Sequence, residues 1–181
     1  MKLAELKKEI EVPAGVEVKV DGRTMIAKGP KGESAKIFAY PKMRISVENN
    51  KVVLSVRKAD KKDKTMLGTF NAHVKNLVNG VEGGFTYKLR ICSGHFPMNV
   101  KNEKNIVTIS NFMGEKIPRK AKILSGVNVD IQGDIITLTG ANKENVGQSA
   151  ANIELATRRT GFDKRVFQDG CYIIEKSGRE L

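Results

Sequence analysis

The sequence predicts an α+β protein built from two tandem, similar domains, each an antiparallel β-sheet packed by one α-helix. The first reason is an internal repeat: a shift of 82 places lays residues 18–33 over residues 100–115 without a gap. The second is a series of short runs in which apolar and polar residues alternate, as they do in half-buried strands. The third is a helix pattern late in each copy. Two copies of one strand-and-helix unit therefore account for the chain.

The frame of the repeat continues well beyond its first block. Three more matches follow in order: 45–47 with 127–129, 52–53 with 135–136, and Gly68-x-x-x-Ala72 with Gly147-x-x-x-Ala151. Chance similarity between two β-rich stretches is the alternative explanation. A frame shared over so long a stretch favours duplication.

The first copy reads as strands followed by a helix. Asp21-Gly22 and Asn49-Asn50 are turn signals between alternating runs, and Pro30 lies in a glycine-rich turn that ends a strand. Thr65 can cap the helix and Gly80 can end it. Six apolar residues lie on one face of this helix: Met66, Leu67, Phe70, Val74, Leu77 and Val78. A strand over residues 85–91 is expected to close the copy.

The second copy repeats the order with a slimmer helix. Strands are expected near 98–101, 106–110, 127–131 and 135–139, and a helix from about 144 to 159. The residues expected on the buried face of this helix are small: Val146, Ala150, Ile153 and Ala156 or Thr157. With no low-complexity linker in the sequence, we place the two domains at 1–91 and 92–181.

The charge balance points to an anionic partner. The formal net charge is +12 over 181 residues, and the isoelectric point is near 9.7. No apolar stretch approaches the length of a membrane span or of a secretory signal, so we expect a protein that is not exported and has no membrane partner. Cys92 and Cys171 are far apart and form no C-x-x-C pattern, which argues against a disulfide framework and against zinc.

The strongest candidate for binding is the stretch Thr157–Lys176. Gly161 is placed to stop the second helix, so that Arg158 and Arg159 lie at its end. Lys164 and Arg165 follow, and three aromatic residues are spaced among the cations: Phe162, Phe167 and Tyr172. Cations bind phosphates and flat side chains stack on unpaired bases, so the stretch suits a folded RNA. The alternative is a solvated helix end whose aromatic residues pack in the core.

The sequence contains two further basic clusters. Residues 57–64 join strand to helix in the first copy, and their interspersed acids favour a solvated loop. The other cluster is more concentrated, and its Pro118 indicates an extended stretch that can follow a nucleic-acid backbone. It contributes four candidate RNA-binding cations: Lys116, Arg119, Lys120 and Lys122.

No pattern in the sequence supports catalysis. His95 lies in a loop-like stretch without the nucleophile and carboxylate that a catalytic histidine needs, so we interpret it as a polar loop residue. His73 is interpreted as a helix residue, and the residues 29–34 lack the spacing of a phosphate-binding loop. We therefore expect no catalytic residue, no cofactor and no metal. An enzyme acting on an anionic substrate would require a convergent acid–base or nucleophile pair.

Three separated blocks resemble one known family. They are HFPMNV at 95–100, NFMGEK at 111–116 and RRTGFDKRVFQDGCYIIEK at 158–176. In this order they resemble the archaeal and eukaryotic branch of the large-subunit ribosomal protein L-six family. The motifs of the family are matched best at the residues Asn111, Phe112, Gly114, Glu115, Lys116, Asp169, Gly170 and Tyr172. Met113 and Cys171 stand where a branched aliphatic residue is expected, and Glu115 is expected to be structural because phosphate repels a carboxylate.

The resemblance implies a function as well as a fold. Members of that family have two tandem α+β domains and are structural constituents of the large ribosomal subunit. They bind large-subunit (23S-type) rRNA mainly through the carboxyl domain, near the base of the factor-binding stalk. For this chain it implies a cytoplasmic protein of the ribosome, not a homo-oligomer, whose neighbours are stalk-base ribosomal proteins and translation factors. A stand-alone basic nucleic-acid-binding module is the alternative.

Overall fold

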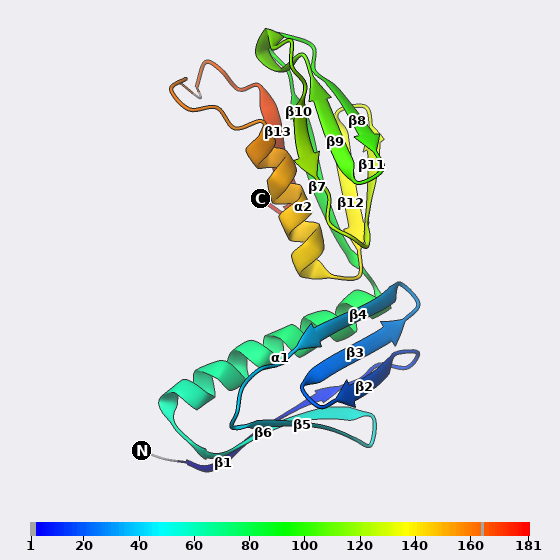
Figure 1. Cartoon of the computed structure of the whole chain (residues 1–181), viewed down its shortest axis with the longest axis vertical. Helices are drawn as coiled ribbons and strands as arrows, with labels where there is room; N and C mark the ends of the chain where they lie inside the picture. The colour runs from blue at the N-terminus through cyan, green and yellow to red at the C-terminus, as the bar shows by residue number, and fades with distance from the viewer. Residues whose placement is uncertain (1–2, 164) are drawn as a thin grey trace. The chain divides into compact units, whose positions relative to one another are not determined.

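The computed structural model describes residues 3–163 and 165–181 and divides the chain into two compact units, one up to Gly84 and one from Phe85 onward. Each unit contains antiparallel sheets and one long helix (Figure 1). The predicted architecture of two tandem α+β domains is therefore confirmed. Neither helix in the described residues has an apolar stretch long enough to cross a bilayer.

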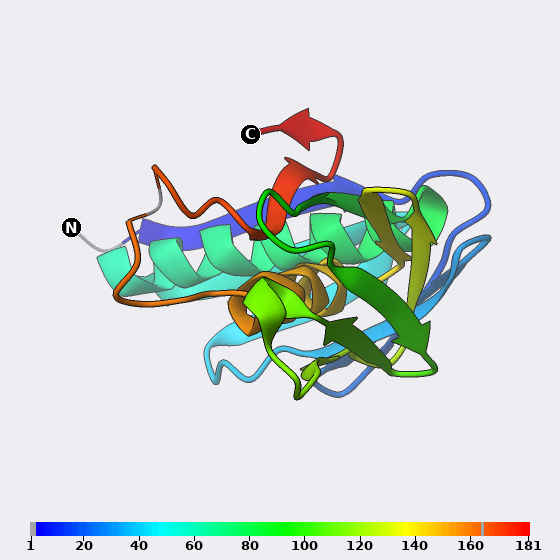
Figure 2. The ribbon, with the colours of Figure 1, turned by 90° about the horizontal axis from the view of Figure 1, so that it is seen from above.

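In the first unit, six strands form two three-stranded sheets, in the orders β1-β6-β5 and β2-β3-β4. The strands are β1 (Leu3–Glu11), β2 (Glu17–Asp21), β3 (Thr24–Gly29), β4 (Gly32–Ile37), β5 (Met43–Glu48) and β6 (Lys51–Ala59). The helix α1 (Lys61–Glu82) follows and packs against β1, β3, β4 and β6 (Figures 1 and 2). Its apolar face includes the buried residues Leu67, Phe70, Val74, Leu77 and Val78, as the periodicity predicts.

The second unit has a three-stranded sheet in the order β10-β9-β8 and a five-stranded sheet in the order β11-β12-β7-β13-β14. Its strands are β7 (Phe85–Cys92), β8 (Asn99–Glu103), β9 (Ile106–Ser110), β10 (Arg119–Lys122), β11 (Val127–Gln132), β12 (Ile135–Gly140), β13 (Gly170–Lys176) and β14 (Arg179–Glu180). A short 3-10 turn, η1 (Phe112–Gly114), precedes β10, and α2 (Lys143–Ala156) precedes β13. Val146, Ala150 and Ile153 are fully buried, so the slim face of α2 is the packed one.

The strand β7 opens the second unit. It pairs with β12 on one side and β13 on the other, whereas the sequence pattern placed it at the end of the first copy. The 82-place shift explains the difference, because it lays β1 over residues 85–93 and β1 pairs with β6 as β7 pairs with β12. The boundary predicted between residues 91 and 92 is therefore corrected to the junction of Gly84 and Phe85.

The two copies differ at one sheet edge. In the first unit β1 is an edge strand of its described sheet, whereas in the second unit β13 pairs along the equivalent edge of β7. The segment that connects α2 to β13 has no counterpart in the first copy, because α1 is followed directly by β7. The candidate binding stretch is this addition to the repeat.

Both helices have ends that differ from the predicted ones. The helix α1 begins four residues before Thr65, because the backbone N–H of Asp60 is bonded by the Asp63 carboxylate at 2.9 Å. It also runs two residues past Gly80. The helix α2 ends at Ala156, before the predicted stop at Gly161. The Thr157 hydroxyl accounts for this, since it donates to Glu154 O at 3.0 Å and accepts from the Cys171 N–H at 2.9 Å.

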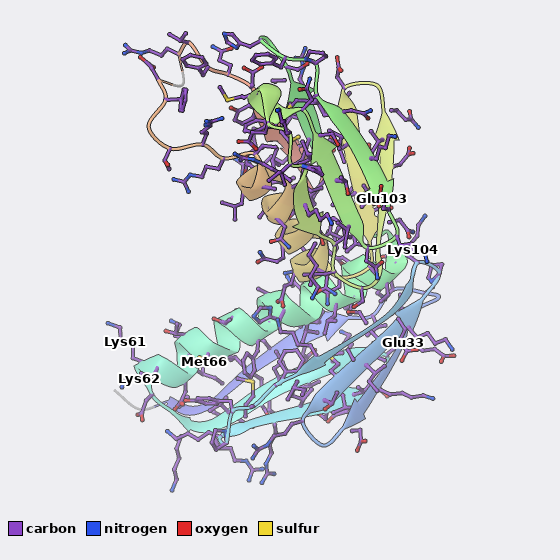
Figure 3. The ribbon with its side chains drawn as sticks, turned by 45° about the horizontal axis from the view of Figure 1, so that its top comes forward. Glu33, Lys61, Lys62, Met66, Glu103 and Lys104 are labelled. Carbon is purple, nitrogen blue, oxygen red and sulfur yellow. The ribbon has the colours of Figure 1, made fainter. Side chains whose placement is uncertain are left out.

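Asp63 is a buried carboxylate that ties the start of α1 to the connection between β4 and β5. Its side chain is 1% exposed and accepts hydrogen bonds from the Tyr40 hydroxyl, from Asp60 N and from Lys42 Nζ. The Tyr40 hydrogen bond is the main reason that the pKa of Asp63 falls from 3.8 to about 2, and the Asp60 and Lys42 contacts add to it against the opposing effect of burial. Lys61 and Lys62, beside it, point into solvent (Figure 3).

Stability of the first unit should therefore decrease in acid. A carboxyl group whose pKa is lower in the folded state stabilises the fold above its unfolded pKa of 3.8, and this contribution disappears as the pH falls toward 2. We expect the thermal midpoint of the first unit, followed by NMR amide signals of α1, to drop over this range in the wild type. Asp63→Asn should lower the midpoint at neutral pH and flatten this acid dependence, while the exposed-site control Asp21→Asn should change neither. An unchanged acid slope in Asp63→Asn would contradict the assignment.

Candidate nucleic-acid interface

The segment between α2 and β13 is fixed at its carboxyl end by Asp169. This buried carboxylate accepts the backbone N–H groups of Gly94 and His95, and its Oδ2 lies 2.6 Å from Nδ1 of His95. Burial alone raises the pKa of Asp169, but the hydrogen bonds from His95 and Gly94 outweigh it and hold the pKa below its ordinary value. The carboxylate is therefore ionised at neutral pH and joins the β7–β8 loop to the start of β13.

Ring and guanidinium groups contact one another in a row that starts at His95, the partner of Asp169. The His95 ring stacks on Phe167 at 5.1 Å, and Phe167 meets Phe162 edge to face at 5.0 Å. The Arg159 guanidinium lies 4.6 Å from the centre of the Phe162 ring. Such contacts contribute about 0.5–1.5 kcal/mol each beyond the area they bury. They give the segment a defined surface in spite of its irregular backbone.

A second network holds the end of α2 against η1 and β10. Arg119 donates two hydrogen bonds of 2.7 Å to the Glu115 carboxylate and further ones to the carbonyl oxygens of Ala156 and Arg158, at 2.8 and 3.3 Å. Its guanidinium also lies 4.4 Å from the centre of the buried Phe112 ring. The Arg119 hydrogen bonds lower the pKa of Glu115 below its usual value. These contacts give Glu115 the structural role expected of it and use most donors of Arg119 inside the protein.

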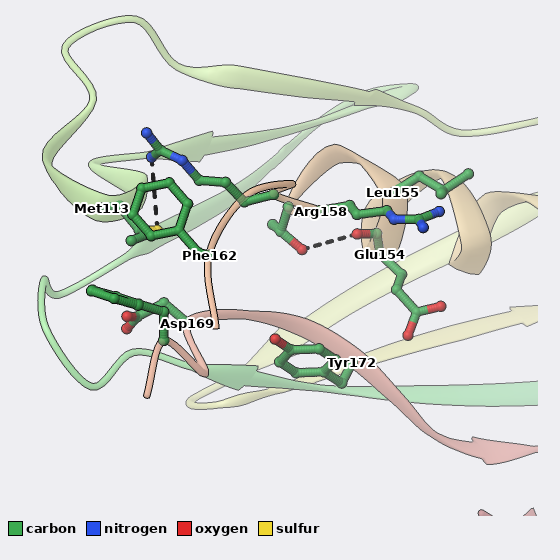
Figure 4. Close-up of a pocket in the computed structure, with 10 residues that line it drawn as sticks. Met113, Glu154, Leu155, Arg158, Phe162, Asp169 and Tyr172 are labelled. Carbon is green, nitrogen blue, oxygen red and sulfur yellow. Dashed lines mark hydrogen bonds between the residues drawn. The ribbon is translucent and has the colours of Figure 1, made fainter. Parts of the chain in front are cut away.

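A cavity of about 290 Å³ lies beside these two networks in the second unit (Figure 4). Phe162 and Tyr172 line it from different segments, and the Glu154 carboxylate lies near the Tyr172 ring. Arg158, which follows α2, is exposed at its rim. The ten residues that line it are Met113, Glu154, Leu155, Thr157, Arg158, Arg159, Phe162, Phe167, Asp169 and Tyr172.

Half of the predicted RNA-binding residues come together here. Arg158, Arg159, Phe162 and Tyr172 line the cavity, and Arg119 supports it from behind. Arg165 lies on the exposed part of the same segment, where it pairs with Asp163 at 2.9 Å. Lys164 lies outside the described residues.

The cations of the other predicted cluster are placed differently. The stretch with Pro118 does not stay a free extended segment, because β10 pairs with β9. Successive side chains of a strand point to opposite faces, so Lys120 and Lys122 lie on the outward face while Arg119 and the buried Ala121 face inward. Lys120 and Lys122 line a separate hollow beside Ile106 and Ile123. Lys116 is exposed before β10.

Sequence reasoning missed several residues of the cavity. Glu154 and Leu155 lie on α2 with no motif around them, so only the fold shows that they face this segment. Met113 stands where a branched aliphatic residue was expected, and its sulfur accepts from Arg159 at 3.8 Å. His95 is a loop residue, as predicted, but one bound to Asp169 across the unit. Among the described residues no group of three or more His, Cys, Asp or Glu is placed to hold a metal ion.

Comparison with known proteins agrees with this division into two copies. The family model described as Ribosomal protein L6 matches residues 12–84 and 96–170, one match in each unit. A protein of Methanobrevibacter smithii named large ribosomal subunit protein uL6 is 48% identical over 173 residues, which is 96% of this chain and 97% of the relative. A protein of Methanococcus vannielii with the same name is 45% identical over 176 residues, 97% of each chain. Two family matches and full-length similarity at this identity show that the chain belongs to the ribosomal protein L6 family.

Proposed function

We propose that the chain is a structural protein of the large ribosomal subunit that binds large-subunit rRNA mainly through its second unit, near the base of the factor-binding stalk. The single observation that carries the assignment to the second unit is the segment between α2 and β13. It gathers Arg158, Arg159, Phe162 and Tyr172 around one cavity and has no counterpart in the first copy. Cations with exposed aromatic rings suit folded RNA, in which unstacked bases lie beside phosphates.

The family and the charge support the same proposal. The two relatives match the chain over 97% of their length, and both are named as large-subunit ribosomal proteins. The chain also has a net charge of +12. A position at the stalk base makes other ribosomal proteins and translation factors its neighbours. The first unit then contributes less to RNA binding. Its basic stretch at 57–64 carries acids as well as lysines, and the side chain of Asp63 in that stretch is buried within the first unit.

Sedimentation tests the function directly. In a density gradient at low salt the chain should travel with the large subunit, and high salt should release it, because phosphate contacts made by cations weaken as salt rises. A stand-alone nucleic-acid-binding module would remain in the light fractions at low salt. A chain that stays free of the large subunit under these conditions would overturn the proposal and favour that module.

A further inference from the structure

We propose that the cavity between α2 and β13 holds one unpaired guanine base of the RNA. This inference rests on the function proposed above and adds the identity of a ligand group at the same site. It is drawn from the shape of the cavity, from the groups that line it and from the hydrogen-bonding pattern of the four bases.

The walls of the cavity are apolar and partly open to solvent. Phe162, Tyr172 and Leu155 line it and are 40%, 39% and 55% exposed, so three large apolar side chains surround one hollow. Exposed apolar groups gathered in this way mark a binding site more often than a free surface. The Tyr172 ring rests on Gly170, where an added Cβ would lie 3.2 Å from the ring, so glycine at this position leaves the space that the aromatic wall occupies. A flat ligand fits such walls better than a branched one.

The polar side of the cavity presents acceptors. One oxygen of Glu154 accepts the Ile173 N–H at 3.3 Å, and the other makes no hydrogen bond within the described residues. Asp169, by contrast, already accepts from Gly94 and His95. Glu154 is therefore the group with spare capacity, since a carboxylate can accept about four hydrogen bonds.

Only guanine matches an ionised carboxylate at its Watson–Crick edge. Its N1–H and N2–H groups are adjacent donors that the two oxygens of a carboxylate can accept together. On guanine the acceptor O6 lies beyond this pair of donors, whereas adenine, cytosine and uracil each present a single donor on that edge with an acceptor next to it, so the second carboxylate oxygen would face an acceptor that repels it. In RNA complexes, protein side chains recognise unpaired bases through this same edge. Glu154 thus provides both recognition of guanine and rejection of the other bases.

The charges around the rim favour a nucleotide over an aromatic side chain of a protein partner. Arg158 is exposed at the opening, and Arg159 lines the cavity while stacking on Phe162. A base inserted between these groups brings its own phosphate close to the two guanidinium groups, which can bind phosphate through paired N–H donors. Arg159 also pairs with the Glu115 carboxylate at 3.4 Å, so a protein aromatic ring in the cavity would leave only the exposed Arg158 without an anionic partner among the described residues.

The test is an NMR titration of the full chain with single nucleotides, followed through the amide signals of residues 154–172. Guanosine monophosphate should shift these signals and bind at least about tenfold more tightly than the adenosine, cytidine and uridine monophosphates, the size expected for a bidentate contact. Inorganic phosphate controls for binding at the arginines alone. N-acetyltyrosinamide controls for a protein ring. Stronger shifts with either control than with guanosine monophosphate would overturn the proposal.

The variant Glu154→Gln isolates the recognition step. Glutamine keeps the shape and the acceptor for Ile173 N but replaces one oxygen by a donor, so the preference for guanosine monophosphate should be lost. The control Glu103→Gln, on β8 and outside the cavity, should keep it. An unchanged preference in Glu154→Gln, or no shift with any nucleotide up to its solubility limit, would refute the guanine site. If the guanine site is refuted but the chain still sediments with the large subunit, the proposed function stands. If the chain does not sediment with the large subunit, both the proposed function and the guanine site are refuted.

Discussion

Replacing Arg158, Arg159, Lys164 and Arg165 together by alanine should weaken binding to a large-subunit rRNA fragment by about 10³-fold, at about 1 kcal/mol for each lost charged contact. The slope of log affinity against log salt should also become shallower by roughly 0.7–0.9 for each phosphate contact removed. Both quantities can be measured in filter-binding titrations at several salt concentrations. Arg158 and Arg159 line the cavity, so they should account for much of the loss.

The matched control removes the same number of charges from the first unit. Lys58, Lys61, Lys62 and Lys64 are all exposed, and their replacement by alanine should change affinity far less. Since both variants lower the net charge equally, a general electrostatic effect predicts equal losses. Equal losses would contradict the assignment of the second unit as the main binder, while unequal losses would locate the binding energy at the segment between α2 and β13.

Phe112→Ala should destabilise the second unit by about 3–5 kcal/mol, the usual cost of truncating a buried phenylalanine. The Phe112 ring is fully buried and lies under the Arg119 guanidinium, so its loss removes core packing and the support of the Glu115 network together. Phe162→Ala is the matched control. That ring is 40% exposed, so its removal should cost much less stability.

Cys171 provides a reporter for this unfolding. Its thiol is fully buried, and burial raises its pKa to about 12, so alkylating reagents reach it as a thiolate only when the second unit opens. Labelling of Cys171 across a urea series, read by mass spectrometry, therefore follows the second unit without interference from the first. A midpoint for Phe112→Ala equal to that of Phe162→Ala would show that the η1 region does not support the core.

Local patterns predicted the repeated elements well but missed those that depend on distant partners. The alternating runs at β2, β3, β5, β6, β9, β11 and β12 and the apolar faces of both helices were correct. β1 was missed because Leu3, Leu6 and Ile10 have helical spacing among charged residues, and pairing with β6 overrides that preference. β10 was missed because only Ala121 among its residues is buried.

The candidate site was predictable in composition and not in geometry. Cations interleaved with aromatic residues identified the segment, and the structure places four of the predicted residues at one cavity. Besides the nearby Glu115, the partners of Arg119 are carbonyl oxygens about forty positions away, at Ala156 and Arg158, so no local pattern could show that most of its donors are occupied. Glu154 is one acid among many on the sequence, and only the packing of α2 beside β13 gives it a role.

The pairing of β7 with β13 has a consequence for how the chain is made. The first strand of the second unit must wait for residues 170–176 before its edge is covered, whereas the first unit closes with α1 before β7 is synthesised. During translation the first unit can therefore complete its fold while the second is still incomplete. The edge of β7, a strand that carries the apolar residues Leu89 and Ile91, stays unpaired until residues 170–176 have been synthesised. A message cut short before Gly170 leaves that edge permanently available for pairing with other nascent chains, so truncated products should aggregate.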